Sequence, residues 1–323
     1  MSENAPEPGT RPEILAVAKL SPLLMAPLQE AFVVHDRLHE TDPQAFAAAA
    51  PRIRAIAASG ESKVGAALIA QMPALRLVSV MGVGYDGIDV AAAKARGVVV
   101  THTPGVLNDD VADLAIALML GVARGIGAAD RYVRAGRWAS GPMPLARKLS
   151  GARLGLVGMG RIGQAIAHRA VAFDMKVAYT ARTARPELAY RYAPTPATLA
   201  AESDFLAVIT PGGAATRHLI DAEVLRALGP KGFLINVARG SVVDQAALID
   251  ALQRGVIAGA GLDVFENEPQ VPAELCALDN VLLTPHIGSA TSDTRQAMAD
   301  LALANLLAHF GGRALLSPVP ECA

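Results

Sequence analysis

Short runs of β-branched and other apolar residues alternate along the chain with alanine-rich stretches whose apolar positions repeat at helical spacing. This alternation is typical of repeated strand–helix units, and it predicts parallel sheets covered by helices. The pattern occurs twice. The first series predicts strands at 14–19, 53–59, 76–80 and 98–102, with a helix at 89–96. The second predicts strands beginning at 153 and at 177–180, 205–210, 233–237, 258–263 and 281–285.

Two longer helical stretches separate and follow these series. The stretch 109–135 has few breakers before Gly136 and is interpreted as a helix that joins two domains. A second helix is predicted at 290–310, long enough to return to the first domain. We therefore expect two doubly wound α/β domains, with parallel sheets flanked by helices and a cleft between them. The expected boundaries give one domain of residues 1–101 and 287–323, and another of residues 102–286.

The composition suits this picture of two folded domains. The chain has 323 residues, of which 52% are hydrophobic and 18% charged, and its mean hydropathy is +0.33. Such a chain buries substantial cores and is not disordered. Lys and Arg total 29 against 30 Asp and Glu. A formal charge of −1 gives no electrostatic reason to expect a nucleic acid or an anionic membrane as partner.

No targeting or metal signal changes the picture. The longest apolar run, 114–123, is about half of the ~20 residues needed to span a bilayer, so it predicts a buried helix. Residues 1–11 are polar and lack the pattern of a secretion signal, which predicts a cytoplasmic protein. Cys276 and Cys322 have no metal-type spacing and are expected to be inert. No zinc-type ligand cluster is apparent, so no metal is expected.

The first chemical signal is a glycine-rich turn, GLVGMGRIG at 155–163, placed after an apolar strand and before a helix. Gly158 would allow the tight turn, Gly160 the approach of a pyrophosphate, and Gly163 close packing of helix on strand. The alternative is an ordinary glycine-rich turn, but the strand before, the helix after and the strand at 177–180 disfavour it. The sequence therefore predicts a Rossmann-like dinucleotide site in the domain 102–286.

The end of the next strand indicates which dinucleotide. A site for NAD normally places Asp or Glu there, about 20 residues after the turn, to bind the ribose 2′-hydroxyl. No acidic residue lies between Asp174 and Glu187. The expected positions read Thr180, Ala181, Arg182 and Thr183. A guanidinium and a hydroxyl suit a 2′-phosphate, so NADP(H) is predicted in preference to NAD(H). Two alternatives stay open: Arg182 is a solvated loop residue, or Arg185 shares its role.

Six segments, in order, resemble one enzyme family. They are GVGYD at 82–86, TPGVL at 103–107, the glycine turn, NVARG at 236–240, GLDVFENEP at 261–269 and PHIGSA at 285–290. From about residue 80 to residue 318 the chain resembles the D-isomer-specific 2-hydroxyacid dehydrogenases. The resemblance is strongest to their NADPH-dependent glyoxylate/hydroxypyruvate and hydroxyphenylpyruvate reductases. It implies that residues 1–101 with 287–323 bind the substrate and 102–286 bind NADP.

The resemblance also implies that Arg239, Glu268 and His286 are catalytic, and each follows a predicted strand, where open α/β sheets bind ligands. His286 would protonate the forming alkoxide, and Glu268 would keep the imidazole charged and oriented. Arg239 would polarise the keto group and hold the substrate carboxylate. Glu266 competes with Glu268, but the family pattern places the active carboxylate immediately before the proline. Glu266 is therefore expected to be solvated.

Other positions carried over from the family are expectations of the same kind. The backbone amides of Val83 and Gly84 should bind the substrate carboxylate, together with Arg239 and His286. Asp263 should face the nicotinamide carboxamide, with a buried, internally satisfied carboxylate as the alternative. Gly212 and Gly213 replace the family's usual Leu-Thr after Thr210-Pro211. The full set of expected cofactor contacts is Gly158, Met159, Gly160, Arg161, Ile162, Ala181, Arg182, Thr183, Thr210, Pro211, Thr216, Val237, Ala238, Arg239, Asp263, His286, Gly288 and Ser289.

The resemblance also bears on the oligomeric state and on the substrate. The family pattern suggests a homodimer through the cofactor domains, with the helix at 113–123 packed on its mate; a monomer core is the alternative. A loop at 138–145 of the second subunit would help close the pocket, and Gly141, Pro142 and Met143 would leave it open. Glyoxylate or hydroxypyruvate is the first substrate choice, and 4-hydroxyphenylpyruvate the second.

A binding protein is the alternative of a different class. The corepressors called C-terminal binding proteins share the expected fold and polar residues, but they add disordered tails. This chain ends at Ala323, shortly after its last predicted helix. Cofactor-dependent peptide capture without turnover would favour that alternative.

Overall fold

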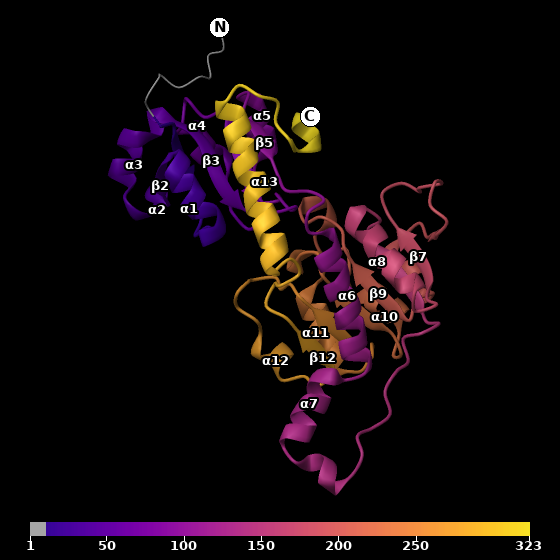
Figure 1. Cartoon of the computed structure of the whole chain (residues 1–323). Helices are drawn as coiled ribbons and strands as arrows, with labels where there is room; N and C mark the ends of the chain where they lie inside the picture. The colour runs from indigo at the N-terminus through magenta and orange to yellow at the C-terminus, as the bar shows by residue number, and fades with distance from the viewer. Residues whose placement is uncertain (1–10) are drawn as a thin grey trace. The chain divides into compact units, whose positions relative to one another are not determined.

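The computed structural model describes residues 11–323 and divides into two compact units. Unit 1 comprises the described residues up to Leu107 together with Thr291–Ala323, and unit 2 comprises Asn108–Ala290 (Figure 1). The prediction that residues 1–11 are no secretion signal concerns a segment that, except for Arg11, lies outside the described residues. The sequence had placed the domain boundaries after residues 101 and 286, a few residues before the boundaries of these units. The substrate-binding and cofactor-binding roles of the two domains, and a cleft between them, stay predictions.

Unit 1 is built on a five-stranded parallel sheet with the order β2-β1-β3-β4-β5. The strands are β1 (Glu13–Ala16), β2 (Val33–Asp36), β3 (Ile53–Ser59), β4 (Leu77–Met81) and β5 (Val99–Thr101). The chain reverses direction across the sheet between β1 and β3, as in doubly wound folds. The four predicted strands are found within a few residues. The edge strand β2 was not predicted, because it has only four residues, two of them polar and none fully buried.

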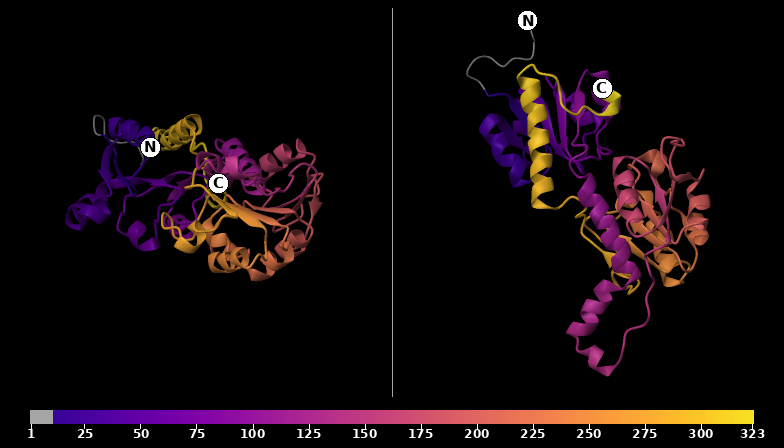
Figure 2. Two further views of the ribbon diagram at one scale, coloured as in Figure 1. Left: turned by 90° about the horizontal axis from the view of Figure 1, so that it is seen from below. Right: turned by 45° about the vertical axis from the view of Figure 1, so that its right-hand side comes forward.

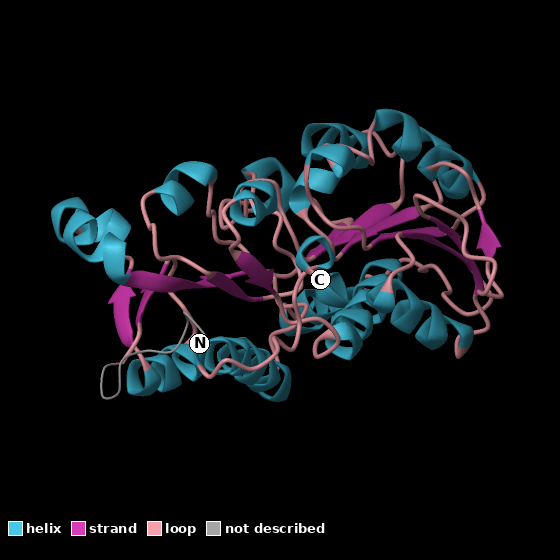
Figure 3. Ribbon diagram, turned by 90° about the horizontal axis from the view of Figure 1, so that it is seen from above, coloured by secondary structure: helices cyan, strands magenta, loops and turns pink. Residues whose placement is uncertain are grey.

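Helices cover both faces of this sheet (Figure 3). They are α1 (Pro22–Ala31), α2 (Leu38–Thr41), α3 (Pro43–Ala49), α4 (Ala66–Ala70), α5 (Val90–Ala95) and α13 (Ser292–Phe310), with 3-10 turns η1 (Ala50–Arg52) and η5 (Pro320–Cys322). The predicted helix at 290–310 is α13. It packs on α1 and β4, where the buried Ser79 hydroxyl donates to Ala302 O at 2.9 Å. This contact joins the end of the chain to the first sheet.

Unit 2 is built on a seven-stranded parallel sheet with the order β12-β11-β10-β9-β6-β7-β8. The strands are β6 (Arg153–Val157), β7 (Lys176–Thr180), β8 (Arg191–Tyr192), β9 (Phe205–Val208), β10 (Phe233–Asn236), β11 (Gly259–Leu262) and β12 (Val281–Leu283). Six of these were predicted, whereas the two-residue β8 was not. The chain changes direction between β6 and β9, which is the usual ligand position in such sheets.

The helices of unit 2 also lie on both faces of its sheet (Figure 3). They are α6 (Asn108–Ala123), α7 (Ile126–Arg134), α8 (Arg161–Val171), α9 (Pro196–Ala201), α10 (Ala222–Leu228), α11 (Gln245–Gln253) and α12 (Ala273–Cys276), with 3-10 turns η2 (Arg137–Ser140), η3 (Ala214–Thr216) and η4 (Gly240–Val242). One apolar core runs beneath α9, α10 and α11. The two parallel sheets with helices on both faces confirm the predicted fold class.

The prediction of one helix over 109–135 is wrong. The stretch forms α6 and α7, bent by 59°, because Gly125 adopts a left-handed conformation with φ +61°. In the right-hand view of Figure 2, α7 and the residues after it extend away from the sheet of unit 2. No single helix in the described part of the chain is long and apolar enough to cross a membrane; α6 and α7 reach that length and hydropathy only together.

The apolar run of α6 is a core element of its own unit. Its buried residues include Val111, Ala115, Leu118 and Met119, and the helix packs on α8, β10 and β11. The monomer-core interpretation therefore accounts for this run without a second subunit.

Candidate functional site

The predicted site residues of unit 2 gather at one edge of its sheet. Each belongs to a segment that follows a strand: the glycine turn follows β6, 181–183 follow β7, and 210–216 follow β9. Residues 237–239, 263–268 and 284–289 follow β10, β11 and β12. Because all strands are parallel, these six segments share the carboxyl edge.

The glycine turn has the geometry of a phosphate cradle. Gly158 has φ +109°, and a Cβ there would lie 2.8 Å from Ile209 O. A Cβ on Gly163 would lie 2.5 Å from Gly158 O, so only glycine lets α8 start this close to β6. Gly160 caps α8 and has nothing within 4 Å of its Cβ position. The first amides of α8 lack intrahelical acceptors, and the positive end of the helix dipole lies at this turn.

The loop after β7 separates the two arginine candidates. Arg185 Nη1 donates to Met159 O at 2.7 Å and Arg185 Nε lies 3.5 Å from Glu187, so this side chain ties the loop to the glycine turn. The Tyr179 hydroxyl accepts from Arg185 N at 2.6 Å. Arg182 is exposed and has no hydrogen-bond or ion-pair partner among the described residues. Arg182 is therefore the guanidinium that can meet a ligand.

The segment after β9 is a closed turn. Thr216 Oγ1 donates to Pro211 O at 2.7 Å and lies 3.3 Å from Gly213 O. The Thr216 hydroxyl therefore holds the turn, a role that the sequence did not reveal. Thr210 is half-buried and Pro211 exposed at the strand end.

The turn that carries Arg239 is held by Asn236, for which the sequence had suggested no role. Asn236 Nδ2 donates to Arg239 O at 3.0 Å, and Asn236 Oδ1 accepts from Ala238 N at 3.1 Å. Arg239 Nη1 donates to Ala238 O at 2.8 Å, which uses one of its five N–H donors. A Cβ on Gly240 would overlap the backbone of Phe265 and Glu266. Glycine at 240 thus brings the Arg239 turn against the loop that carries Glu268.

Glu268 and His286 form a half-buried pair in unit 2. His286 Nδ1 lies 2.7 Å from Glu268 Oε2, and Glu268 Oε1 accepts from Phe265 N at 2.8 Å. Both carboxylate oxygens are therefore fixed, and Nδ1 of the imidazole is turned toward the carboxylate. This leaves Nε2 as the ring nitrogen that faces away from Glu268.

The environment keeps Glu268 ionised. Burial acts to raise the pKa of the Glu268 carboxyl, but the hydrogen bonds from His286 and Phe265 N, with the charges of His286 and Arg239, outweigh burial and lower the pKa below its ordinary value. A lowered pKa means that this pair contributes stability at neutral pH, and that the contribution is lost only as the pH falls below the usual range of a glutamate.

The expectation that Glu266 is solvated is wrong. The Glu266 carboxylate is only 23% exposed and lies 2.8 Å from His218 Nε2 and 3.5 Å from Arg217. Its backbone N–H donates to Gln245 Oε1 at 3.2 Å. Glu266 thus anchors the loop through contacts separate from those of Glu268. His218, Arg217 and Gln245 precede Glu266 by 48, 49 and 21 positions in the chain. No local sequence pattern could therefore predict these contacts.

Asp263 braces the segment that holds His286. The Asp263 side chain is 1% exposed. Its oxygens accept from Thr284 Oγ1 at 2.6 Å and from the N–H groups of Ile287 and Gly288 at 2.8 Å. His286 itself has φ +53°, an unfavourable region for a residue with a side chain. The structure therefore matches the alternative of a satisfied, buried carboxylate, and its contact with a carboxamide stays a prediction.

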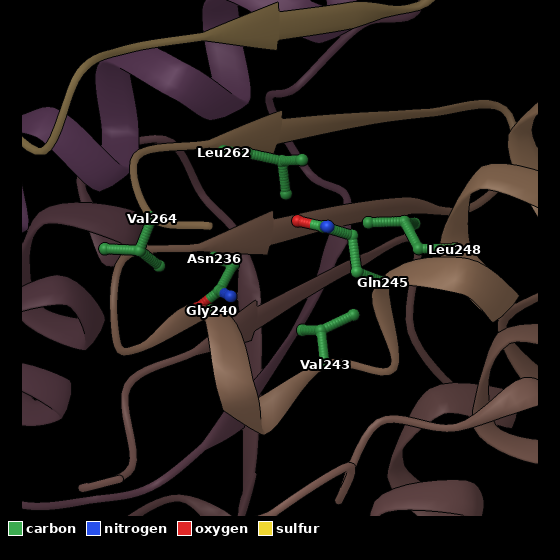
Figure 4. A pocket seen from close by; sticks show the side chains of 7 residues that line it. All are labelled: Asn236, Gly240, Val243, Gln245, Leu248, Leu262 and Val264. Carbon is green, nitrogen blue, oxygen red and sulfur yellow. The ribbon is translucent and has the colours of Figure 1, made fainter. Parts of the chain in front are cut away.

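A small void lies behind this edge, at the base of the Arg239 turn. It is lined by Asn236, Gly240, Val243, Gln245, Leu248, Leu262 and Val264 and has a volume of about 10 Å³. Figure 4 shows the Gln245 amide reaching among these side chains. The void has room for about one water molecule, so it is no substrate site.

In unit 1, the loop after β4 offers two backbone donors. Neither Val83 N–H nor Gly84 N–H has an acceptor among the described residues, although both residues are half-buried. Two adjacent amides without a protein acceptor are available to hydrogen-bond water or a ligand. Gly82 lies too close to Gly60 for a side chain, since a Cβ would lie 2.9 Å from Gly60 Cα.

Comparisons with known proteins agree with this arrangement. A family model described as D-isomer specific 2-hydroxyacid dehydrogenase, NAD binding domain, matches residues 116–288. The chain is 51% identical over 267 residues to a glyoxylate/hydroxypyruvate reductase of Arabidopsis thaliana, covering 83% of this chain and 85% of that protein. It is 49% identical over 270 residues to a hydroxyphenylpyruvate reductase of Plectranthus scutellarioides, covering 84% and 86%.

A solved structure is similar over nearly the whole length. It is an NADPH-dependent glyoxylate/hydroxypyruvate reductase from Sinorhizobium meliloti in complex with NADP and malonate, with 48% identity and a TM-score of 0.92. The match covers 97% of this chain and 98% of that one. The chain belongs to the D-isomer-specific 2-hydroxyacid dehydrogenase family, and unit 2 holds the NAD(P)-binding domain of that family.

Proposed function

We propose that this protein reduces glyoxylate or hydroxypyruvate to the corresponding 2-hydroxy acid with NADPH. The observation that carries the proposal is the Glu268–His286 pair, an imidazole held by a carboxylate at the ligand-binding edge of a dinucleotide-binding sheet. Reduction of a 2-keto acid needs a proton donor at this edge, and relatives with this activity are about half identical to the chain.

The proposed reaction uses the residues of this edge in distinct roles. Bound NADPH supplies a hydride to the keto carbon. As the carbonyl electrons move to oxygen, His286 Nε2–H gives its proton to that oxygen, and the imidazole is left neutral. Glu268 holds Nδ1, which fixes the ring and stabilises its protonated form. Arg239 binds the carboxylate and polarises the keto oxygen. In the reverse direction, His286 accepts the proton.

The substrate's carboxylate needs further donors. We assign them to the N–H groups of Val83 and Gly84, which lack acceptors among the described residues. Two adjacent amides form an anion-binding concavity that favours a carboxylate. On this basis unit 1 is the substrate-binding domain and unit 2 the cofactor domain.

The cofactor preference is proposed from the loop after β7. The turn 158–163 fits a pyrophosphate, because its Cβ-free positions and the start of α8 leave the amides open. Arg182 and Thr183 are exposed beyond the strand end, with no acidic side chain in the stretch 175–186 to repel a 2′-phosphate. Gly158, Met159, Gly160, Arg161 and Ile162 would hold the pyrophosphate, and Arg182 the 2′-phosphate.

Arg182→Ala is expected to weaken NADPH binding by about 1.5 to 3 kcal/mol, the value of a hydrogen bond to a charged group. NADH binding should not change, because NADH has no 2′-phosphate. Titration of cofactor fluorescence measures both dissociation constants. Arg254→Ala is the matched comparison, since Arg254 is an exposed arginine of the same unit that pairs with Asp250 of α11. Equal losses with NADPH and NADH in Arg182→Ala would refute the assignment.

Glu268→Gln is expected to shift the alkaline limb of the kcat/KM profile for reduction to lower pH. His286 lowers the pKa of Glu268, so by reciprocity the ionised carboxylate increases the proton affinity of the imidazole. Without that charge, His286 loses its proton, and the reductase its acid, at lower pH. A shift of about one pH unit corresponds to ~1.4 kcal/mol of interaction. An unchanged profile would show that Glu268 only shapes the loop.

An aryl-pyruvate is the second candidate substrate, because the hydroxyphenylpyruvate reductase relative is nearly as similar as the glyoxylate/hydroxypyruvate reductase. Rates with glyoxylate, hydroxypyruvate and 4-hydroxyphenylpyruvate, each at saturating NADPH, separate the candidates. A higher kcat/KM for either small acid supports the first choice, and a higher value for the aryl acid replaces it.

We also propose that the protein is a homodimer. The exposed large apolar side chains of unit 2 concentrate on α7 and the residues after it: Ile126, Val133, Trp138 and Leu145. Trp138 is 70% exposed, and large apolar side chains gathered in one exposed segment favour an interaction surface. We assign the contact with a second subunit to this segment, because α6 buries one of its faces in the core of its own unit.

A further inference from the structure

One side chain of unit 1 controls the direction of the amide at Gly84. His102, which follows β5, lies with Nδ1 3.0 Å from Val83 O. A carbonyl oxygen only accepts, so Nδ1 carries the proton and donates it. The Val83–Gly84 peptide is trans, because the one cis bond of the described chain is Glu268–Pro269.

This bond fixes more than the carbonyl. In a planar trans peptide, the C=O of one residue and the N–H of the next point in opposite directions. With Val83 O held toward His102, Gly84 N–H must point away from His102. A donor on the carbonyl also polarises the same peptide group and makes its N–H a stronger donor. The N–H of Gly84 has no acceptor among the described residues.

The imidazole is itself held from two sides. The Tyr85 ring packs edge-on against the His102 ring, with 5.3 Å between centroids. The Tyr85 hydroxyl donates to Glu321 Oε2 at 3.1 Å, in the last turn of the chain. Desolvation by burial, the hydrogen bond to Glu321 and the charges of Glu321 and Cys322 raise the pKa of Tyr85 to about 12, so the phenol stays a donor.

The C-terminal segment also binds the backbone at His102. Ser317 Oγ donates to His102 O at 2.6 Å, and His102 N donates to Ser317 O at 3.1 Å. Lys94 Nζ donates to Glu321 O at 2.7 Å. Figure 1 shows this C-terminal segment beside α5 and β5. Contacts between residues more than 200 positions apart in the sequence thus hold the His102 backbone and the Tyr85 ring that packs on the imidazole.

We propose that His102 is a positioning residue that aims and polarises the Gly84 N–H for the substrate carboxylate, with Tyr85 and the C-terminal segment holding the imidazole in place. The inference rests on the proposed binding of the carboxylate at Val83 and Gly84. His102 does not touch the reacting atoms, so it should act on binding of the acid and leave hydride transfer largely unchanged.

The test compares His102→Phe, which keeps a ring against Tyr85 but removes the donor, with His102→Asn, whose amide can donate to Val83 O. The KM for glyoxylate should rise about tenfold in His102→Phe, with kcat within about threefold and the NADPH dissociation constant unchanged. His102→Asn should recover most of the loss. His35→Phe is the matched control, because His35 is also half-buried in unit 1 but is bonded to Glu13, away from this loop.

A second readout does not need turnover. Malonate, a carboxylate that cannot be reduced, is titrated into the complex with NADP, and its dissociation constant should rise about tenfold in His102→Phe. If the wild type reduces no keto acid yet the malonate effect is found, the positioning role stands while the proposed reaction fails. If the wild type is active but His102→Phe binds malonate and glyoxylate normally, the inference is overturned.

The variants also guard against a merely structural effect. Each is first checked for a cooperative thermal transition; if His102→Phe does not fold, His102→Asn and Tyr85→Phe decide. Tyr85→Phe removes only the bond to Glu321 and should raise the KM in the same direction by about twofold to threefold. Should His102→Asn be as defective as His102→Phe, the hydrogen bond to Val83 O is not the cause.

Discussion

His286→Ala is expected to lower kcat for keto-acid reduction by about 10²- to 10⁴-fold, the range of general acid catalysis. The loss follows because no other described side chain is paired with Glu268 in the way that His286 is. NADPH binding should stay within about twofold, since the imidazole acts on the substrate and not on the phosphates. Stopped-flow absorbance of NADPH measures the chemical step, and fluorescence titration measures cofactor binding.

The control for this variant is His168→Ala. His168 lies exposed on α8 of the same unit, and its removal should leave kcat unchanged. Turnover of His286→Ala equal to that of His168→Ala would rule out His286 as the acid. A loss of NADPH affinity in parallel with kcat would instead indicate that the strained His286 segment had moved.

Gly240→Ala is expected to reduce both stability and turnover, although position 240 touches no substrate. Its methyl group would overlap the backbone of Phe265 and Glu266, and a backbone cannot rotate out of the way as a side chain can. The loop must shift, and Glu268, whose Oε1 is bonded to Phe265 N, would shift with it. We expect a loss of about 3 kcal/mol in the free energy of unfolding, measured by urea denaturation, and a large fall in kcat.

Gly65→Ala provides the comparison for a glycine with room. Its Cβ position has nothing within 4 Å, and its φ of −86° suits any residue. A loss of about 0.5 to 1 kcal/mol is expected there, because Ala is a poorer helix N-cap than Gly. If Gly240→Ala were as stable and active as Gly65→Ala, the close contact between the Arg239 turn and the Glu268 loop would not hold in solution.

Most strands were predictable from sequence because buried parallel strands are short apolar runs between turn residues. Strands β2 and β8 were not predicted, since an exposed edge strand and a two-residue strand contain no such apolar run. The stretch 109–135 was predicted as one helix because isolated glycines inside an apolar stretch are compatible with a helix. Only the tertiary structure shows that α6 ends at Ala123 and that Gly125, in a left-handed conformation, caps the start of α7.

The candidate site was predictable where the chemistry is local. The glycine turn and the residues Arg239, Glu268 and His286 lie in compact motifs, and the resemblance assigned them roles. The supporting contacts are not local: Thr284 bonds Asp263 across 21 positions, and His218 pairs with Glu266 across 48. Which polar side chain meets another at such distances depends on the sheet order, which no short pattern specifies.

We propose that this edge of unit 2 transfers a hydride from NADPH to a small 2-keto acid. The test follows the loss of NADPH absorbance with hydroxypyruvate while chiral analysis identifies the product. We expect one D-glycerate formed for each NADPH oxidised, with much slower oxidation of NADH. Absence of oxidation with hydroxypyruvate, glyoxylate and 4-hydroxyphenylpyruvate, in a folded protein that binds NADPH, would rule this function out.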